Sequence, residues 1–266
     1  MMQISIKDAS TESRLSFTLR MDESRPWWRD LDLDGQPLYR IGNICDTCEA
    51  MFSKYKSEKL PLEPSRLAEI LRSGLSDIPN EVVEIVTKVL PKGNYSVGLL
   101  NLQPALIKFS EPNYYLWENS KPSSIPTEWL TESEPIQPWW FAQPNKSRGF
   151  QKGKLYEAVL PLISEKSIKR EDIDKYSTEL NDGLKPTALA LSVVDVRSVS
   201  GRAFDWRLIH FLLDGHHKMM AASKTGKPIT LLSFLNIDES FAPKEWIERA
   251  IQVRYKDNLQ NLPNTV

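Results

Sequence analysis

One short segment holds most of the residues in this chain that could do chemistry. A hydrophobic run ends in Asp214-Gly215 and is followed directly by His216, His217 and Lys218. Histidine exchanges protons near neutral pH, and lysine supplies a point charge suited to phosphate. Aspartate can orient an imidazole, hold a divalent cation or accept a proton. The chain has only three histidines, so two of them beside an aspartate and a lysine mark this segment as the first candidate site.

The elements around this segment suggest what it would bind. A strand is predicted over residues 206–213 and a helix over 216–223. The first amides of a helix have no partner within the helix, and the macrodipole favours an anion beside them. Gly215 would let a ligand approach the backbone closely. The predicted phosphate-binding residues are Gly215, His216 and Lys218, and the predicted catalytic residues are Asp214, His216, His217 and Lys218.

The same segment also has a purely structural interpretation. Asp-Gly is an ordinary turn dipeptide, and Asp214 could simply cap the helix amides. A histidine or lysine in the first helical turn can face solvent without any function. Spacing alone leaves both interpretations open.

A family resemblance favours the functional interpretation. Residues 186–234 resemble the ParB/sulfiredoxin-like domain, in particular members with an Asp-Gly-His-His-Arg-like signature at the same strand-to-helix junction. Here the signature reads Asp-Gly-His-His-Lys at 214–218, followed by a turn at Gly226 and the strand 228–234. The resemblance covers under a fifth of the chain. It implies a small α+β domain that binds nucleotide or phosphate at the helix N-terminus, in a superfamily with nuclease, nucleotide-hydrolase, kinase and sulfinic-acid reductase roles.

The chain departs from the family patterns at informative positions. Sulfiredoxins have Gly-Cys-His-Arg where this chain has residues 215–218, so the attacking thiol is missing. The Gly-Glu-Arg-Arg box of chromosome-partitioning proteins is absent, and no helix-turn-helix is evident downstream, so nucleic acid is not an expected partner. Lys218 keeps the charge of the family's arginine but loses its bidentate fork.

The expected function is therefore binding of a nucleotide or phosphoester. Phosphoryl transfer and phosphodiester or nucleotide hydrolysis are the candidate reactions, with a divalent cation such as Mg²⁺ as a candidate cofactor. The alternative is a non-catalytic binding or scaffold protein with a degenerate ParB-like pocket.

Two cysteines form a C-x-x-C motif, Cys45 to Cys48, at the start of a predicted helix. Two buried structural thiols are the simplest interpretation, because unpaired cysteines are commonly buried. Half of a zinc site is a second interpretation, but no further C-x-x-C is present to complete it. A redox pair is the third, without the thioredoxin-like context that usually surrounds one.

The segment from Asp30 to Gly35 has the D-x-D-x-D-G spacing that opens a calcium loop. The glutamate expected at loop position twelve falls on Ile41, so the calcium interpretation fails. We expect instead a turn at Asp34-Gly35 with solvated carboxylates at Asp30 and Asp32.

The middle of the chain is unusual in composition. Residues 104–144 contain seven prolines and four of the eight tryptophans, so long helices and central strands are not expected there. The aromatic run Trp139, Trp140 and Phe141 either packs on a neighbouring core or lines a substrate groove.

Periodicity predicts the remaining elements. Strands are predicted over 4–6, 15–19, 95–102, 187–195 and 229–234, and helices over 65–73 and 170–180, from Asp77, and after Pro243. A helix is also predicted from Asp46, because Cys48, Met51, Phe52 and Tyr55 would share one face. Alternation along strand 206–213 separates Leu208, His210 and Leu212 from Ile209, Phe211 and Leu213. His210 is therefore expected in the core and outside the site.

These elements define the expected fold as α+β. A C-terminal ParB/sulfiredoxin-like unit of order β-β-α-β is expected, with an N-terminal helical and stranded region packed on it. The predicted segments are residues 1–103, a Pro/Trp-rich connection over 104–154, and 155–266.

Composition excludes several classes of protein. The chain has 266 residues, a formal net charge of −1, 41% hydrophobic and 26% charged residues, which rules out wholesale disorder and a global basic excess. Two cysteines are too few for a disulfide scaffold. The N-terminal residues lack the apolar run of a signal peptide, and the longest apolar runs are far too short to span a bilayer. We expect a soluble cytoplasmic protein without a membrane partner.

Overall fold

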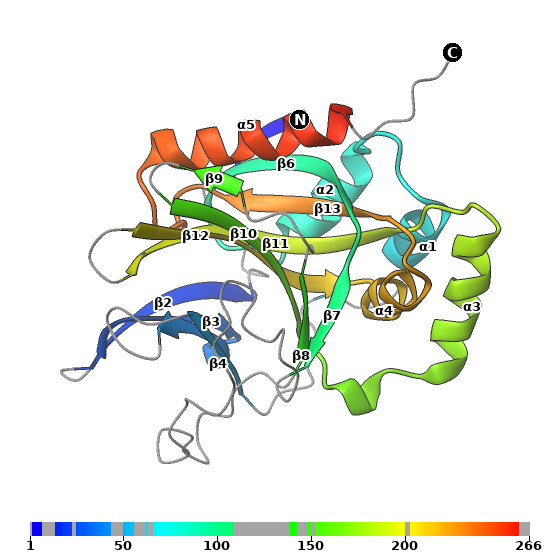
Figure 1. The fold of residues 1–266 in the computed structure, drawn as a ribbon, viewed down its shortest axis with the longest axis horizontal. Helices are drawn as coiled ribbons and strands as arrows, with labels where there is room; N and C mark the ends of the chain where they lie inside the picture. Colours follow the sequence, from blue (N-terminus) through cyan, green and yellow to red (C-terminus); the bar gives the residue numbers. More distant parts are fainter. Residues whose placement is uncertain are drawn as a thin grey trace.

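The fold is mixed α+β, with one large mixed sheet, a smaller sheet and five α-helices among the described residues (Figure 1). The computed structural model describes residues 2–6, 14–22, 25–43, 50–55, 62, 66–108, 139–142, 148–150, 153–199 and 203–260.

The first half of the chain supplies the smaller sheet, two helices and part of the large sheet. Its elements are β1 (Met2–Ile6), β2 (Leu15–Asp22), β3 (Arg25–Leu33), β4 (Gln36–Asn43), β5 (Ala50–Lys54), α1 (Arg66–Ser73), α2 (Asn80–Thr87), β6 (Gly93–Leu102) and β7 (Ala105–Lys108). The second half supplies most of the large sheet and three helices. Its elements are β8 (Trp139–Ala142), β9 (Arg148–Phe150), β10 (Gly153–Pro161), a 3-10 turn (Glu165–Ser167), α3 (Arg170–Asn181), β11 (Thr187–Val199), β12 (Ala203–Asp214), α4 (His216–Thr225), β13 (Ile229–Asn236) and α5 (Lys244–Gln260).

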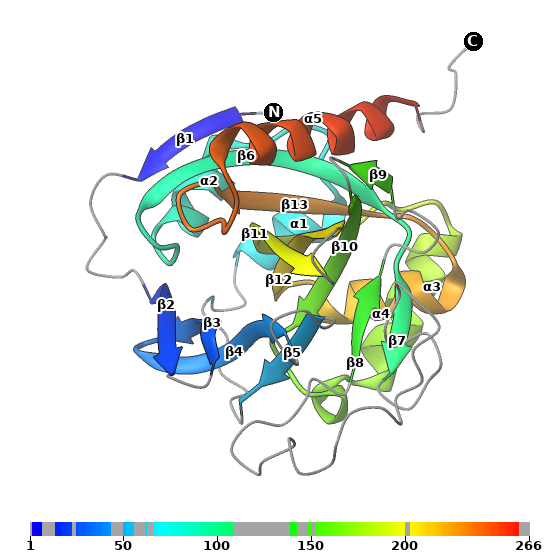
Figure 2. The same cartoon turned by 60° about the vertical axis from the view of Figure 1, so that its left-hand side comes forward.

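The large sheet curls round on itself. Its strand order is β1-β6-β13-β11-β12-β10-β8-β7, with β9 paired to β10. β7 follows β6 after only two residues, yet the two strands lie near opposite ends of this order. The sheet must therefore curve until its two ends approach each other, and β6 bends round into β7 in both ribbon views (Figures 1 and 2).

Two helices cover one face of this curled sheet. α4 contacts β7, β11 and β13, and its buried residues share an apolar cluster with Leu212 and Phe141. α5 covers the other end of the same face through a second cluster that includes Leu208 and Ile247. This face therefore has two apolar regions, one under each helix.

The opposite face packs against α1, α2 and the smaller sheet, whose order is β2-β3-β4-β5. The ring of Tyr39 meets that of Phe211 edge-on, with centroids 5.7 Å apart. The Tyr39 hydroxyl donates to the carbonyl oxygen of Pro161 at 2.6 Å. These contacts attach the smaller sheet to β10 and β12.

Most of the predicted helices and strands are present. α1, α2, α3, α4 and α5 begin within a few residues of the predicted starts, and β6, β11, β12 and β13 contain the predicted strands. The alternation in β12 is also confirmed: Ile209, Phe211 and Leu213 belong to the cluster facing the smaller sheet, whereas Leu208 and Leu212 face the helices. His210 is fully buried, as predicted.

The helix predicted from Asp46 is wrong where the structure describes it. Residues 50–54 form the strand β5, in which Phe52 pairs with Ile41 of β4 and is buried. Cys45, Asp46 and Cys48 lie outside the described residues. The apolar pattern that suggested a helical face is short, and a pattern of that length also suits a strand. β4 provides the strand with which these residues pair.

The predicted environment of the N-terminal aspartates is only partly correct. Asp34 and Gly35 form the hairpin turn between β3 and β4, and both have positive φ, 51° and 73°. Asp30 and Asp32, however, are buried rather than solvated. Asp30 accepts hydrogen bonds from Arg40, and Asp32 accepts one from Thr18 at 2.6 Å, so both carboxylates have partners.

The aromatic run at residue 139 is a strand rather than an irregular segment. β8 pairs with β10 on one side and β7 on the other, contrary to the expectation that central strands are absent there. Trp139 and Phe141 are fully buried and their rings meet edge-on. These two residues belong to the core, which contradicts the groove interpretation. The side chain of Trp140 lies outside the described part of the chain.

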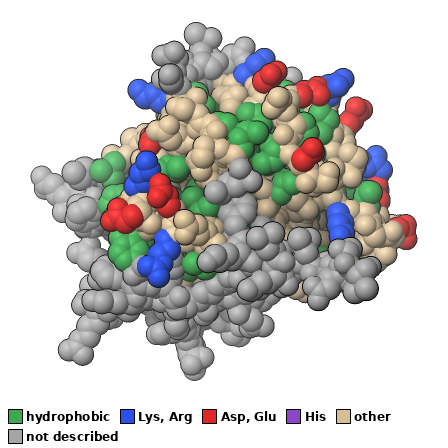
Figure 3. All heavy atoms as spheres, turned by 90° about the horizontal axis from the view of Figure 1, so that it is seen from above, with side chains coloured by type: hydrophobic (Ala, Val, Ile, Leu, Met, Phe, Trp, Pro, Cys, Tyr) green, Lys and Arg blue, Asp and Glu red, His purple; other side chains and the backbone are tan. Residues whose placement is uncertain are grey.

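The large sheet takes strands from all three segments predicted from the sequence, since β6, β8 and β12 lie in different segments. On the face shown in Figure 3, the acidic and basic side chains of the described residues are interspersed rather than separated by sign. Among these residues, no helix has the length and apolar character required to cross a membrane.

Candidate functional site

The turn that begins the predicted site is held by close packing. Gly215 follows the end of β12 with φ of 92° and is the N-cap of α4. A Cβ atom on Gly215 would lie 2.8 Å from the Cβ atom and 2.9 Å from the Cα atom of Ala188 in β11. The backbone conformation and the close approach of Ala188 therefore already require glycine here, independently of any ligand.

His216 makes a buried hydrogen bond within the protein. Its imidazole is buried, and Nε2 accepts a hydrogen bond from the backbone amide of Leu162 at 3.1 Å. A ring nitrogen that accepts an amide hydrogen bond carries no proton. His216 thus fixes the segment after β10 to the start of α4, and its Nε2 cannot act as a general acid in this arrangement.

His217 is the more accessible of the two histidines. Its side chain is 26% exposed, and Nε2 accepts a hydrogen bond from the amide of Lys169 at 3.1 Å. Asp172 Oδ2 lies 3.7 Å from the same nitrogen. Burial lowers the pKa of His217 below its usual value, although Asp172 acts in the opposite direction. The neutral ring therefore carries its proton on Nδ1, which is left to donate a hydrogen bond.

Lys218 is buried and bound by the protein. Its Nζ donates to the carbonyl oxygen of Thr187 at 3.0 Å and to Asp214 Oδ2 at 3.2 Å. It also lies over the ring of Tyr176, 6.0 Å from the centroid. Burial lowers the pKa of Lys218, and Asp214 opposes that shift. The ammonium group thus joins β11 to the end of β12.

Asp214 is the partly exposed member of this pair. Its side chain is 31% exposed, against 4% for Lys218. An i,i+4 ion pair with one buried partner is screened less than a surface pair, so the two charges largely neutralise each other locally. Of the predicted site residues, Asp214 and His217 therefore offer the accessible polar groups.

A second ion pair lies close to the site. Arg72 of α1 pairs with Glu179 of α3, and both groups contribute to the electrostatic environment of Lys218. Burial raises the pKa of Tyr176, and the carboxylate of Asp214 raises it further. The phenol therefore stays protonated near neutral pH.

The structure brings the five signature residues together, and four of them contact other segments of the fold. Gly215 packs on β11, His216 holds the segment after β10, His217 holds the segment before α3, and Lys218 spans β11 and β12. The N-terminus of α4 itself has no side-chain cap. The junction therefore places a carboxylate and a neutral histidine at a helix N-terminus, where the macrodipole favours an anion.

Sequence reasoning missed three residues at this site: Asp172, Tyr176 and Thr187. The first two lie on α3 and the third begins β11, more than twenty-five residues before the signature in each case. Only the acidic first turn of α3 gave a signal, because acidic residues favour a helix N-terminus, and that signal concerns the helix rather than the site.

No cluster of three potential metal-ligating side chains is present in the described parts of the chain. The zinc interpretation of Cys45 and Cys48 lies outside those parts and stays a prediction.

The fold and site define the chain as a mixed α+β protein with a strand-to-helix junction at the C-terminal end of β12, an interior strand of a curled sheet. Comparisons with protein-family models, curated proteins and solved structures gave no match for this chain.

Proposed function

We propose that the protein binds a phosphate-containing small molecule, a nucleotide in the first instance, at the junction of β12 and α4. The observation that carries this proposal is the position of Asp214, His217 and Lys218 at the N-terminus of a ten-residue helix whose N-cap, Gly215, has no capping side chain. The first amides and the positive end of the macrodipole favour an anion at such a helix N-terminus. The ParB-like resemblance supports the same ligand, and the chain order β11, β12, α4, β13 is the expected β-β-α-β order.

The contacts of each residue suggest separate roles in this proposal. The Nδ1 atom of His217 donates to a phosphate oxygen, because Nε2 is already bonded to the amide of Lys169. Asp214 is the carboxylate that would hold a divalent cation accompanying the phosphate. Lys218 supports the turn and contributes its charge from a buried position.

The test is direct binding. Thermal unfolding and titration calorimetry with ADP, ATP and pyrophosphate, each with and without Mg²⁺, should show stabilisation by at least one of them. His217→Ala should weaken that binding by about tenfold, the effect of one hydrogen bond to a charged group. Lys224→Ala is the matched control, because Lys224 is an exposed lysine in the last turn of the same helix. Equal effects of the two substitutions would contradict the assignment of the site.

A second candidate function is favoured by the contacts of Lys218. Its ammonium group already bonds to Thr187 and Asp214, as expected if the signature only joins β11, β12 and α4 in a non-catalytic binding or scaffold protein. Lys218→Met separates the candidates. Loss of stability with no nucleotide effect favours the scaffold, whereas weaker nucleotide binding at retained fold favours the phosphate site. Turnover of a bound nucleotide, and its loss in His217→Ala, would establish an enzyme.

A further inference from the structure

A cavity separate from the signature lies at the end of the sheet beside α1. It has a volume of about 600 Å³ and is formed where the C-terminal end of α1 meets β6, β13 and the segment before β11. Pockets of this size hold small organic ligands. Nothing in the proposed phosphate site uses these walls.

The walls of the cavity combine apolar surface with a few polar groups. Leu99, Leu100 and Ile229 supply apolar surface from β6 and β13. Ser76 and Thr230 add hydroxyl groups that can donate hydrogen bonds. This composition suits a ligand with a hydrocarbon or aromatic body and one polar end.

The charge of the lining indicates the sign of that polar end. Among the described residues that line the cavity, Lys185 is the one with a positively charged side chain, and none has a carboxylate. Lys185 is exposed, and no ion pair between Lys185 and a carboxylate is found in the described part of the chain. A single unpaired lysine matches a monoanion better than the multiple charges of a nucleotide.

The wall near Lys185 is fixed before any ligand binds. Gly74 has φ of 85°, and a Cβ atom there would lie 2.3 Å from the carbonyl oxygen of Lys185. The amide of Leu75 donates to the hydroxyl of the buried Thr187 at 2.9 Å. Because these contacts hold the end of α1 against residues 185–187, a ligand need not order this wall on binding.

We propose that this cavity binds a small organic monocarboxylate, with its carboxylate on Lys185 and its apolar body against β6 and β13. The proposal is independent of the phosphate site, because none of the signature residues 214–218 lines the cavity. Thr187 nevertheless contacts one residue of each site. Its hydroxyl accepts a hydrogen bond from the amide of Leu75 in the cavity lining, and its carbonyl oxygen accepts one from Lys218 in the signature.

The test compares three probes of one shape and different charge: 4-phenylbutyrate, 4-phenylbutanol and 4-phenylbutylamine. In amide NMR spectra of the full chain, 4-phenylbutyrate should shift the signals of Leu75, Ser76 and Thr230 at low millimolar concentration. The alcohol should bind more weakly and the amine least. Absence of these shifts, or equal binding of all three probes, overturns the proposal.

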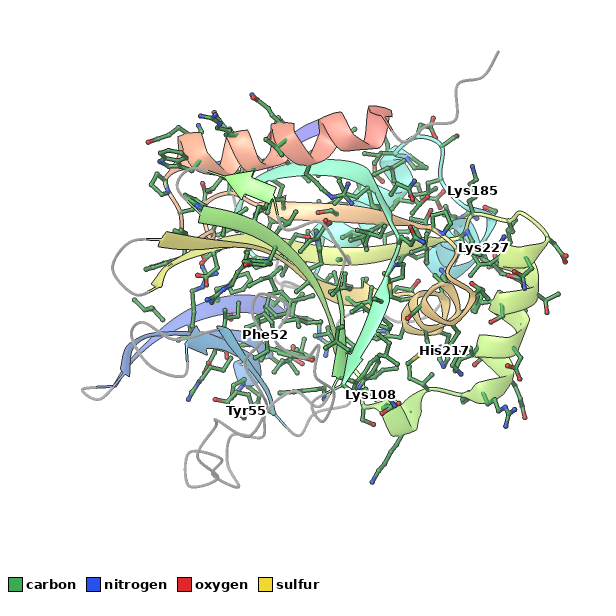
Figure 4. All side chains as sticks on the ribbon, viewed as in Figure 1. Phe52, Tyr55, Lys108, Lys185, His217 and Lys227 are labelled. Carbon is green, nitrogen blue, oxygen red and sulfur yellow. The ribbon has the colours of Figure 1, made fainter. Side chains whose placement is uncertain are left out.

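Matched variants then locate the carboxylate. Lys185→Met should weaken 4-phenylbutyrate binding by about tenfold, as expected for loss of a charge-assisted hydrogen bond. Lys227→Met is the control, because Lys227 is an exposed lysine at the same end of the molecule but outside the lining (Figure 4). Both positions are exposed, so both variants should keep the fold. Equal losses in the two variants would mean a general charge effect and would overturn the site.

Discussion

At the scale of single residues, the signature shows how side chains suited to chemistry are also used for structure. Gly215, His216 and Lys218 are buried and make defined contacts with other segments, whereas Asp214 and His217 keep partial exposure. Asp214 and His217 are therefore the signature side chains that a ligand could reach, whereas the contacts of Gly215, His216 and Lys218 contribute to stability.

Gly215→Ala should destabilise the protein by about 2–4 kcal/mol, because it adds strain at positive φ and a steric conflict with Ala188. Chemical denaturation measures the change. Gly226→Ala is the matched control at the other end of α4: its φ is 64° and nothing lies within 4 Å of the added Cβ atom. It should cost only about 1 kcal/mol. Similar costs at the two positions would show that packing against Ala188 is unimportant.

His217 should make stability depend on pH. Because burial lowers its pKa in the folded state, the unfolded chain binds a proton more readily. The contribution of His217 to stability is complete above pH 6.5, the unfolded value, and is lost as the pH falls through the lower folded value. The free energy of unfolding should therefore fall less between pH 7.5 and 5.5 in His217→Gln than in the wild type. Parallel pH profiles would contradict this prediction.

At the scale of elements, a buried polar row separates the two apolar regions beneath α4 and α5. It crosses four neighbouring strands through Glu157, His210, Ser192 and Ser233. His210 Nε2 lies 3.1 Å from Glu157, its Nδ1 lies 2.7 Å from the Ser192 hydroxyl, and Ser233 donates to Ser192 at 2.9 Å. These residue types occur in nucleophilic triads, but here both serines are buried, so the row satisfies core polar groups instead.

Arg254 connects this row to α5. Its guanidinium donates to both oxygens of Glu157 and to the backbone carbonyl of Asn101. Burial alone would raise the pKa of Glu157, but Arg254 and His210 outweigh it and hold the pKa at about 2. The carboxylate therefore stays ionised in the core and depends on its cation.

Arg254→Met should destabilise the protein by about 3–5 kcal/mol, because it leaves the buried carboxylate of Glu157 without its main partner. Denaturant unfolding at neutral pH measures this effect. Lys244→Met, at the exposed first residue of the same helix, should change stability by less than about 0.5 kcal/mol. A small effect at Arg254 would mean that α5 is held by apolar contacts alone.

At the scale of the whole molecule, the large sheet depends on segments that are distant in the sequence. β13 pairs with β6 along eight residues, and β10 pairs with β8. The core beside the smaller sheet likewise combines Tyr95 and Leu31 with Phe211 and Phe234.

Residues 155–266 alone should therefore fail to fold, although they contain the signature and the strands on either side of it. Without β6, the strand β13 would expose an unpaired edge along eight residues. Amide NMR of this fragment should show poorly dispersed signals, and near-ultraviolet circular dichroism should be weak. A dispersed spectrum would instead establish the predicted segment as an independent domain.

Local patterns in the amino-acid sequence were enough to predict the α+β class, the signature and most elements with a regular apolar period. α1, α3 and α5 were predictable because their periodicity is local and each has one clear buried face. β12 was predictable because it is a largely apolar run, buried on both faces. The strand-to-helix junction at Gly215 was predictable for the same reason, since Asp-Gly after an apolar run is a local signal.

The contacts that these residues make with distant segments became known from the folded chain. β5 became a strand because β4 supplied hydrogen bonds and a buried place for Phe52, which a local pattern does not encode. Lys218 points to Thr187 and Asp214 because folding brings the start of β11 beside α4. Contacts between residues distant in the sequence leave no local periodicity. Neither the hydrogen bonds of Lys218 nor the cavity at Lys185 could therefore be predicted from the sequence alone.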